Sequence, residues 1–178
     1  MTRDDARIRA QALDAQIHAA IGNQLHGPAS EVFSQIRAYL IRRSDEMVTK
    51  NNAIQLVKLA RERNGMALIA LGPAFDKGAT PEHFHFDSGA RLSLGVTLRE
   101  RGKGSEIVSF RFHYQLPEGH SPQYIRFDLN ESLHEDSLAE PRCHLHPGIE
   151  RVRIPISLHN PIEILDQVFF VLETNMAA

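Results

Sequence analysis

The spacing of apolar residues changes near residue 65, and this change divides the chain into two parts. Before it, apolar side chains recur at the spacing of an α-helix, as Val32, Ile36 and Leu40 do. The pattern predicts one helix over 3–24, a second after Gly27 and Pro28, and a third that follows Ser44 and ends at Asn64-Gly65. Residues 1–65 are therefore predicted to be helical.

After residue 65 the period falls to about two, which is typical of half-buried β-strands. Alternation predicts strands within 66–71, 91–99, 108–115, 124–129, 143–146 and 152–156, with a short alternating stretch at 83–87. Arg101-Gly-Lys-Gly104 provides a hairpin turn. Asn160, Pro161 and Glu163 form an N-cap, an N1 proline and a capping-box acid, so a final helix is expected to begin there.

These elements predict an α+β fold. A helical N-terminal part, residues 1–65, precedes an antiparallel β-meander covered by a C-terminal helix, residues 66–178. A chain of 178 residues has about the size of one domain, so residues 1–178 are expected to form a single domain around one core.

Charge and cysteine content narrow the function classes. Twenty Lys and Arg against 22 Asp and Glu give a net charge of -2, so the chain as a whole does not attract nucleic acid. The N-terminus does not resemble a signal peptide, and no run of about 18 apolar residues could span a membrane. The lone Cys143 favours a reducing compartment, and as a strand neighbour of His144 it should face the opposite way. We expect a cytoplasmic protein with no membrane partner.

Strand parity predicts a polar face on the sheet. If the apolar residues face the helices, the opposite face carries imidazole, guanidinium, phenol and carboxylate groups together. Such a set can perform acid–base work on a phosphate ester, because histidine titrates near neutral pH and arginine neutralises developing negative charge. The alternative is an ordinary solvated face. Its predicted members are Arg111, His113, Tyr124, Arg126, Asp128, His144, His146, Arg151 and Arg153.

His144 and His146 form an H-x-H motif on one predicted strand. Two imidazoles placed so lie on one side, about 6.5–7 Å apart at Cα, and can share one divalent metal ion. A second H-x-H, His83 and His85, makes a four-histidine site of cupin-like type conceivable, although no glutamate follows at the expected spacing. In the alternative, the histidines bond to loop carbonyls and have a structural role. Further candidate donors are His113, His134, Asp128 and Glu135.

The run Tyr124-Ile-Arg-Phe-Asp128 precedes the H-x-H motif, the Arg153-Ile-Pro155 motif and the closing helix. This order of motifs, from about residue 107 to 174, resembles small uncharacterised bacterial and phage-associated families. In those families the same pattern recurs, commonly with a proline before the H-x-H, and some members resemble toxin–antitoxin or anti-phage defence components. The resemblance implies a shared fold for this region.

Three functional hypotheses follow. The first is a bacterial defence or toxin–antitoxin component that binds or cleaves RNA or a nucleotide, as a nuclease or phosphodiesterase would. Its candidate catalytic residues are His144, His146, Arg126, Asp128 and Arg153. The second is a non-catalytic interaction module with a protein partner or a second copy of the chain. The third is a cupin-like metal protein that holds a divalent ion through His144, His146, His83 and His85.

Overall fold

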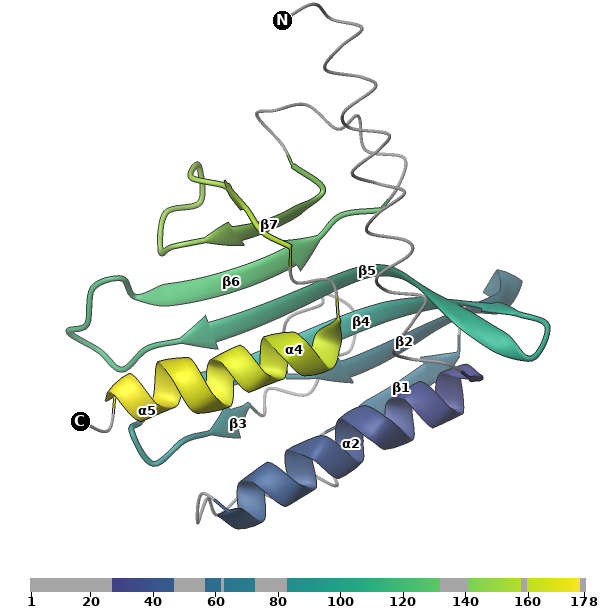
Figure 1. The fold of residues 1–178 in the computed structure, drawn as a ribbon, viewed down its shortest axis with the longest axis horizontal. Coiled ribbons are helices and arrows are strands. Elements are labelled where there is room, and N and C mark those ends of the chain that lie inside the picture. The colour runs from purple at the N-terminus through teal and green to yellow at the C-terminus, as the bar shows by residue number, and fades with distance from the viewer. Residues whose placement is uncertain are drawn as a thin grey trace, which may run out of the picture.

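The computed structural model describes residues 27–46, 57–61, 63–72, 83–131, 141–157 and 160–176. One antiparallel sheet, two longer helical segments and the short 3-10 turn η1, Arg63–Gly65, make up this part of the chain (Figure 1). The fold is α+β, with a helix before an antiparallel meander and a helix after it, as the sequence predicts. The predicted helix over 3–24 lies outside the described residues.

The sheet has eight strands, and its order β1-β2-β4-β5-β6-β7-β8 follows the chain almost throughout. Only β3 leaves this path, and it pairs with β4. The strands are β1 Lys58–Arg61, β2 Met66–Leu71, β3 Phe84–His85, β4 Arg91–Arg101, β5 Gly104–Gln115, β6 Tyr124–Leu129, β7 Cys143–His146 and β8 Ile154–Pro155.

The hairpin between β4 and β5 is the longest pairing and forms where the sequence predicts it. Arg101 pairs with Gly104, so Gly102 and Lys103 form a two-residue loop. Gly102 has a φ of 60°, and a positive φ at the first loop position suits the right-handed twist of the flanking strands. A β-bulge between Thr97 and Leu98 shifts the register once along this hairpin.

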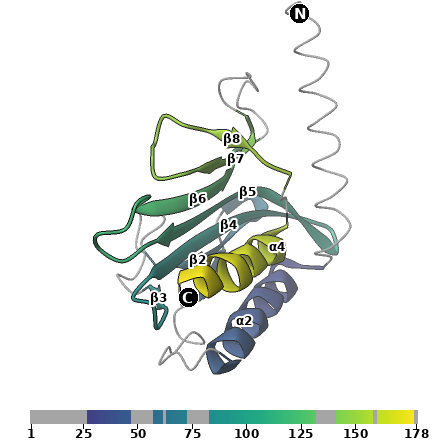
Figure 2. The same cartoon turned by 60° about the vertical axis from the view of Figure 1, so that its left-hand side comes forward.

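Both helical segments lie on the same face of the sheet (Figures 1 and 2). The first is α2, Ala29–Glu46, and the second is the C-terminal run of α4 Pro161–Asp166, the π-helical segment η2 Gln167–Leu172 and α5 Glu173–Met176. Asn160 caps α4, because its side-chain oxygen accepts a hydrogen bond from the Ile162 amide at 2.8 Å. The predicted start of this helix is confirmed.

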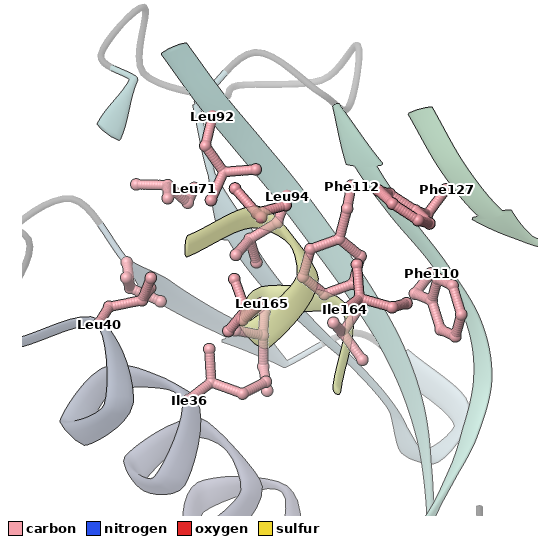
Figure 3. Close-up of a cluster of buried hydrophobic side chains, with 14 of the residues drawn as sticks. Ile36, Leu40, Leu71, Leu92, Leu94, Phe110, Phe112, Phe127, Ile164 and Leu165 are labelled. Atoms are coloured by element: carbon pink, nitrogen blue, oxygen red, sulfur yellow. The ribbon is translucent and has the colours of Figure 1, made fainter. Parts of the chain in front are cut away.

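The core lies between the helices and this face of the sheet (Figure 3). Ile36 and Leu40 of α2 and Ile164 and Leu165 of α4 point toward the strands, and all four are fully buried. Burial of each such side chain stabilises the fold by about 1.5–3 kcal/mol. The sheet side is lined by Leu71, Leu92, Leu94, Phe110, Phe112 and Phe127.

The third predicted helix is wrong over residues 58–61, while residues 45 and 46 belong to the end of α2. Residues 58–61 form the edge strand β1, which pairs with β2 from Lys58 opposite Ala70 to Arg61 opposite Ala67. Asn64 and Gly65 have φ values of 71° and 73°, so they turn the chain back between two strands and do not end a helix. Pairing with β2 overrides the helical spacing. Residues 47–56 lie outside the described part.

Candidate functional site

Strand register on the face away from the helices brings the predicted polar residues into two rows. In one row Arg111 of β5 lies opposite Asp128 of β6, which in turn lies opposite His144 of β7. The next row has the same arrangement: His113 of β5 lies opposite Arg126 of β6, which lies opposite His146 of β7. Because side chains two residues apart share a face, both rows are on one surface of the sheet.

Asp128, His144 and His146 converge in the buried part of this surface. The two Nε2 atoms lie 3.0 Å apart. Asp128 Oδ2 is 3.4 Å from Nε2 of His146 and 3.8 Å from Nε2 of His144. The relative exposures of Asp128, His144 and His146 are 4%, 1% and 1%. Among the described residues, these are the ones that form a group of at least three potential metal donors. We call this group the His–His–Asp cluster.

Contacts of His144 indicate which of its nitrogens faces the cluster with a lone pair. Its Nδ1 lies 2.6 Å from the carbonyl oxygen of Pro141, so Nδ1 carries the hydrogen and donates it. Burial lowers the pKa of His144, although the nearby Asp128 carboxylate opposes this effect. A neutral ring with a hydrogen on Nδ1 has its free lone pair on Nε2. The lone pair of His144 Nε2 therefore points toward His146 and Asp128.

His146 has a buried nitrogen that no described residue satisfies. Its Nδ1 is buried and has no hydrogen-bond partner in the described structure. If Nε2 carries the hydrogen, it donates to His144 and Nδ1 is left as an unpaired acceptor; if Nδ1 carries it, two lone pairs face each other at 3.0 Å. Either state leaves a buried polar atom unpaired at a cost of about 1–3 kcal/mol.

Asp128 is fixed by two arginines. Arg126 donates from Nε to Oδ2 at 2.7 Å, and Arg111 donates from Nε to Oδ1 at 3.2 Å. Arg126 also binds Glu150 through both terminal nitrogens, at 2.9 and 2.8 Å. This bidentate contact lowers the pKa of Glu150 to about 2. The carboxylate of Asp128 is thus held in place while each of its oxygens keeps a further acceptor site.

Other residues predicted for the site have different positions. Arg153 is half-buried and close enough to His144 for its charge to lower the pKa of that histidine. His83 and His85 lie at β3, which pairs with β4, so β4, β5 and β6 separate them from β7. At about 4.8 Å between strands, the two H-x-H motifs are more than about 15 Å apart. The structure therefore does not form a four-histidine site.

Two neighbours of the cluster were not among the predicted site residues. Arg111 belongs to the predicted polar face, but parity alone does not indicate that it pairs with Asp128. Glu150 follows the Pro147-Gly148 turn, outside any alternating stretch, so the sequence pattern contains no signal for its contact with Arg126. These two contacts depend on strand register and on a loop, and neither is set by periodicity.

Cys143 has no part in this cluster. It lies in the apolar core on the helix-facing side, next to His144 in sequence but on the other face of β7. Burial raises the pKa of its thiol to about 12. The prediction that Cys143 and His144 face opposite ways is confirmed, and a nucleophile–base pair between them is excluded.

Comparison with known proteins assigns no family. No family model, curated protein or solved structure matches the chain. Within the described ranges, no helix is long and apolar enough to cross a membrane. Function must therefore be argued from the geometry of the cluster.

Proposed function

We propose that this protein binds a divalent transition-metal ion through Asp128, His144 and His146. The observation that supports the proposal most is the spacing of the three donor atoms, 3.0, 3.4 and 3.8 Å. Metal–ligand bonds of about 2.1 Å with angles of 90–110° separate neighbouring donors by about 3.0–3.4 Å. Two of the distances fall in this range, and a shift of about 0.4 Å between His144 and Asp128 brings in the third.

Features around the donors also suit a metal centre. The Nδ1 contact of His144 with the Pro141 carbonyl is the kind of bond that orients a histidine ligand and leaves Nε2 free. The hydrogen bonds from Arg111 and Arg126 orient the carboxylate in the same way. Two imidazoles and one carboxylate suit Zn²⁺, Fe²⁺ or Mn²⁺ and leave coordination positions for a further ligand.

Metal titration of the full-length chain tests the proposal. After chelator treatment and dialysis, isothermal titration with Zn²⁺ should show one ion per chain. The double variant His144→Ala/His146→Ala should lose this binding. The matched control His83→Ala/His85→Ala removes the other H-x-H motif and should bind as the wild type does. Binding retained by the first variant, or no stoichiometric binding of Zn²⁺, Co²⁺ or Mn²⁺ by the wild type, would contradict the proposal.

Cleavage of RNA or a nucleotide by a bacterial defence or toxin–antitoxin component remains a second proposal for the same cluster. It is favoured by the three guanidinium groups of Arg111, Arg126 and Arg153 around the histidines, since arginine suits phosphate. RNA degradation should then be abolished by chelator and by the His144→Ala/His146→Ala variant. Activity that survives both treatments would remove the cluster from this role. The interaction-module hypothesis remains a prediction from sequence.

A further inference from the structure

Arg111 contacts the His–His–Asp cluster through Nε and has two terminal nitrogens that bind no group in the described structure. Its Nε binds Asp128 Oδ1. No hydrogen bond or ion pair joins its two terminal nitrogens to the described residues. Its side chain is 48% exposed, against 15% for Arg126, whose terminal nitrogens are both bound to Glu150. Arg111 therefore connects the buried cluster with solvent.

Charges around the cluster favour an anion. The guanidinium groups of Arg111 and Arg126 balance the two carboxylates of Asp128 and Glu150 among the described neighbours. A divalent cation between the histidines and Asp128 would therefore add an excess of two positive charges. Charges held in partly buried surroundings require compensation, because desolvation makes an uncompensated ion costly. A ligand with two negative charges supplies it.

Geometry limits the size of that ligand. The three donors are at most 4% exposed, so a large surface cannot reach them, whereas a small group can approach beside the half-exposed Arg111. A guanidinium presents paired N–H donors that match two oxygens of one phosphate. A metal with three protein ligands has coordination positions left for another oxygen of the same group.

We infer that the cluster and Arg111 together bind a terminal phosphate monoester, with one oxygen on the metal and two on the Arg111 guanidinium. This inference rests on the proposed metal site and names its ligand class. The dianionic monoester fits the positive excess better than the single charge of an internal phosphodiester. The same chemistry occurs in a free mononucleotide and at the 5′ end of an RNA.

Phosphate binding by the zinc-loaded protein tests this inference. The full chain with stoichiometric Zn²⁺, free of excess metal, is titrated with inorganic phosphate and then with AMP. Arg111→Ala should weaken the affinities for inorganic phosphate and for AMP by about tenfold or more, as expected for loss of a charge-assisted contact. Arg101→Ala removes an equal charge at the distant β4–β5 turn and should change neither affinity. Zinc affinity of each variant is measured separately.

A second measurement separates the two sources of the phosphate. A short RNA with a 5′ phosphate and the same RNA with a 5′ hydroxyl are compared on the zinc-loaded wild type. Preference for AMP over both indicates a free mononucleotide, and preference for the phosphorylated RNA indicates an RNA end. Equal binding of the two RNAs together with no binding of AMP would overturn the inference.

The results also distinguish its failure from failure of the metal proposal. Zinc binding without any phosphate response, or equal phosphate affinity in wild type and Arg111→Ala, overturns the inference and leaves the metal site standing. Absence of zinc binding removes the metal site and the inference with it. The zinc and phosphate titrations together therefore show which of the two proposals, the metal site or the phosphate site, a negative result contradicts.

Discussion

The hydroxyl of Tyr114 donates a hydrogen bond of 2.5 Å to Glu173 Oε1, and so connects the C-terminal end of β5 with the C-terminal helix. Ser88 donates to the same oxygen at 3.0 Å. Both Tyr114 and Glu173 are buried. The helix is therefore held on the sheet by a polar contact within the apolar layer, and this contact allows two separate tests.

Removal of the phenol oxygen should destabilise the protein. Tyr114→Phe leaves Glu173 with Ser88 as its remaining donor, and loss of a buried partner of this kind costs about 1–3 kcal/mol. The free energy of unfolding from urea titration measures the change. Tyr124→Phe is the matched control, because its hydroxyl binds Glu150 in an exposed position. We expect the control to change stability by less than about 0.5 kcal/mol, and an equal loss in both variants would contradict the prediction.

Glu173 should also make stability depend on pH. Burial raises its pKa above the ordinary glutamate value of 4.5, and the hydrogen bonds from Tyr114 and Ser88 oppose this rise. Between the unfolded and the raised folded pKa, the folded state binds more protons, so stability falls as pH rises through this window. Glu173→Gln should flatten that fall above pH 4.5. The control Glu118→Gln changes an exposed carboxyl and should keep the wild-type slope.

The face on which the site residues lie follows from the sequence, whereas their pairing does not. Alternation places Arg126 and Asp128 on one side of β6, and His144 and His146 on one side of β7, whatever the register. Which member of one pair lies opposite which member of the other depends on the connection between the strands. That connection, from 130 to 142, has no alternating pattern and no short turn that would fix it.

The edge strand β1 illustrates a different reason for failure. Lys58, Ala60 and Arg61 are exposed, and Leu59 is only partly buried, so β1 has no clear apolar alternation. Pairing of its backbone with β2 fixes its conformation, and a sequence pattern does not contain that information. The Asn64-Gly65 pair is a signal that favours a hairpin, since both residues take positive φ.

The N-cap of the C-terminal helix, which the sequence predicts, should contribute measurably to stability. Asn160→Ala removes the acceptor for the Ile162 amide and should lower the free energy of unfolding by about 1 kcal/mol. Asn160→Asp keeps an acceptor at this position and should retain most of the stability. Asn175→Ala serves as a control near the other end of the same helical run. An Asn160→Ala variant as stable as the wild type in urea would show that the cap is dispensable.

Cys143 should be protected from thiol reagents until the protein unfolds. Burial raises its thiol pKa to about 12, so at pH 8 only about one molecule in ten thousand carries the reactive thiolate, and the core also blocks access. Reaction with a disulfide reagent, followed by absorbance, should be very slow in the native protein. In denaturing guanidinium chloride, one thiol per chain should react rapidly, because Cys143 is the single cysteine. Rapid labelling under native conditions would mean that the strand β7, and with it the His–His–Asp cluster, opens readily.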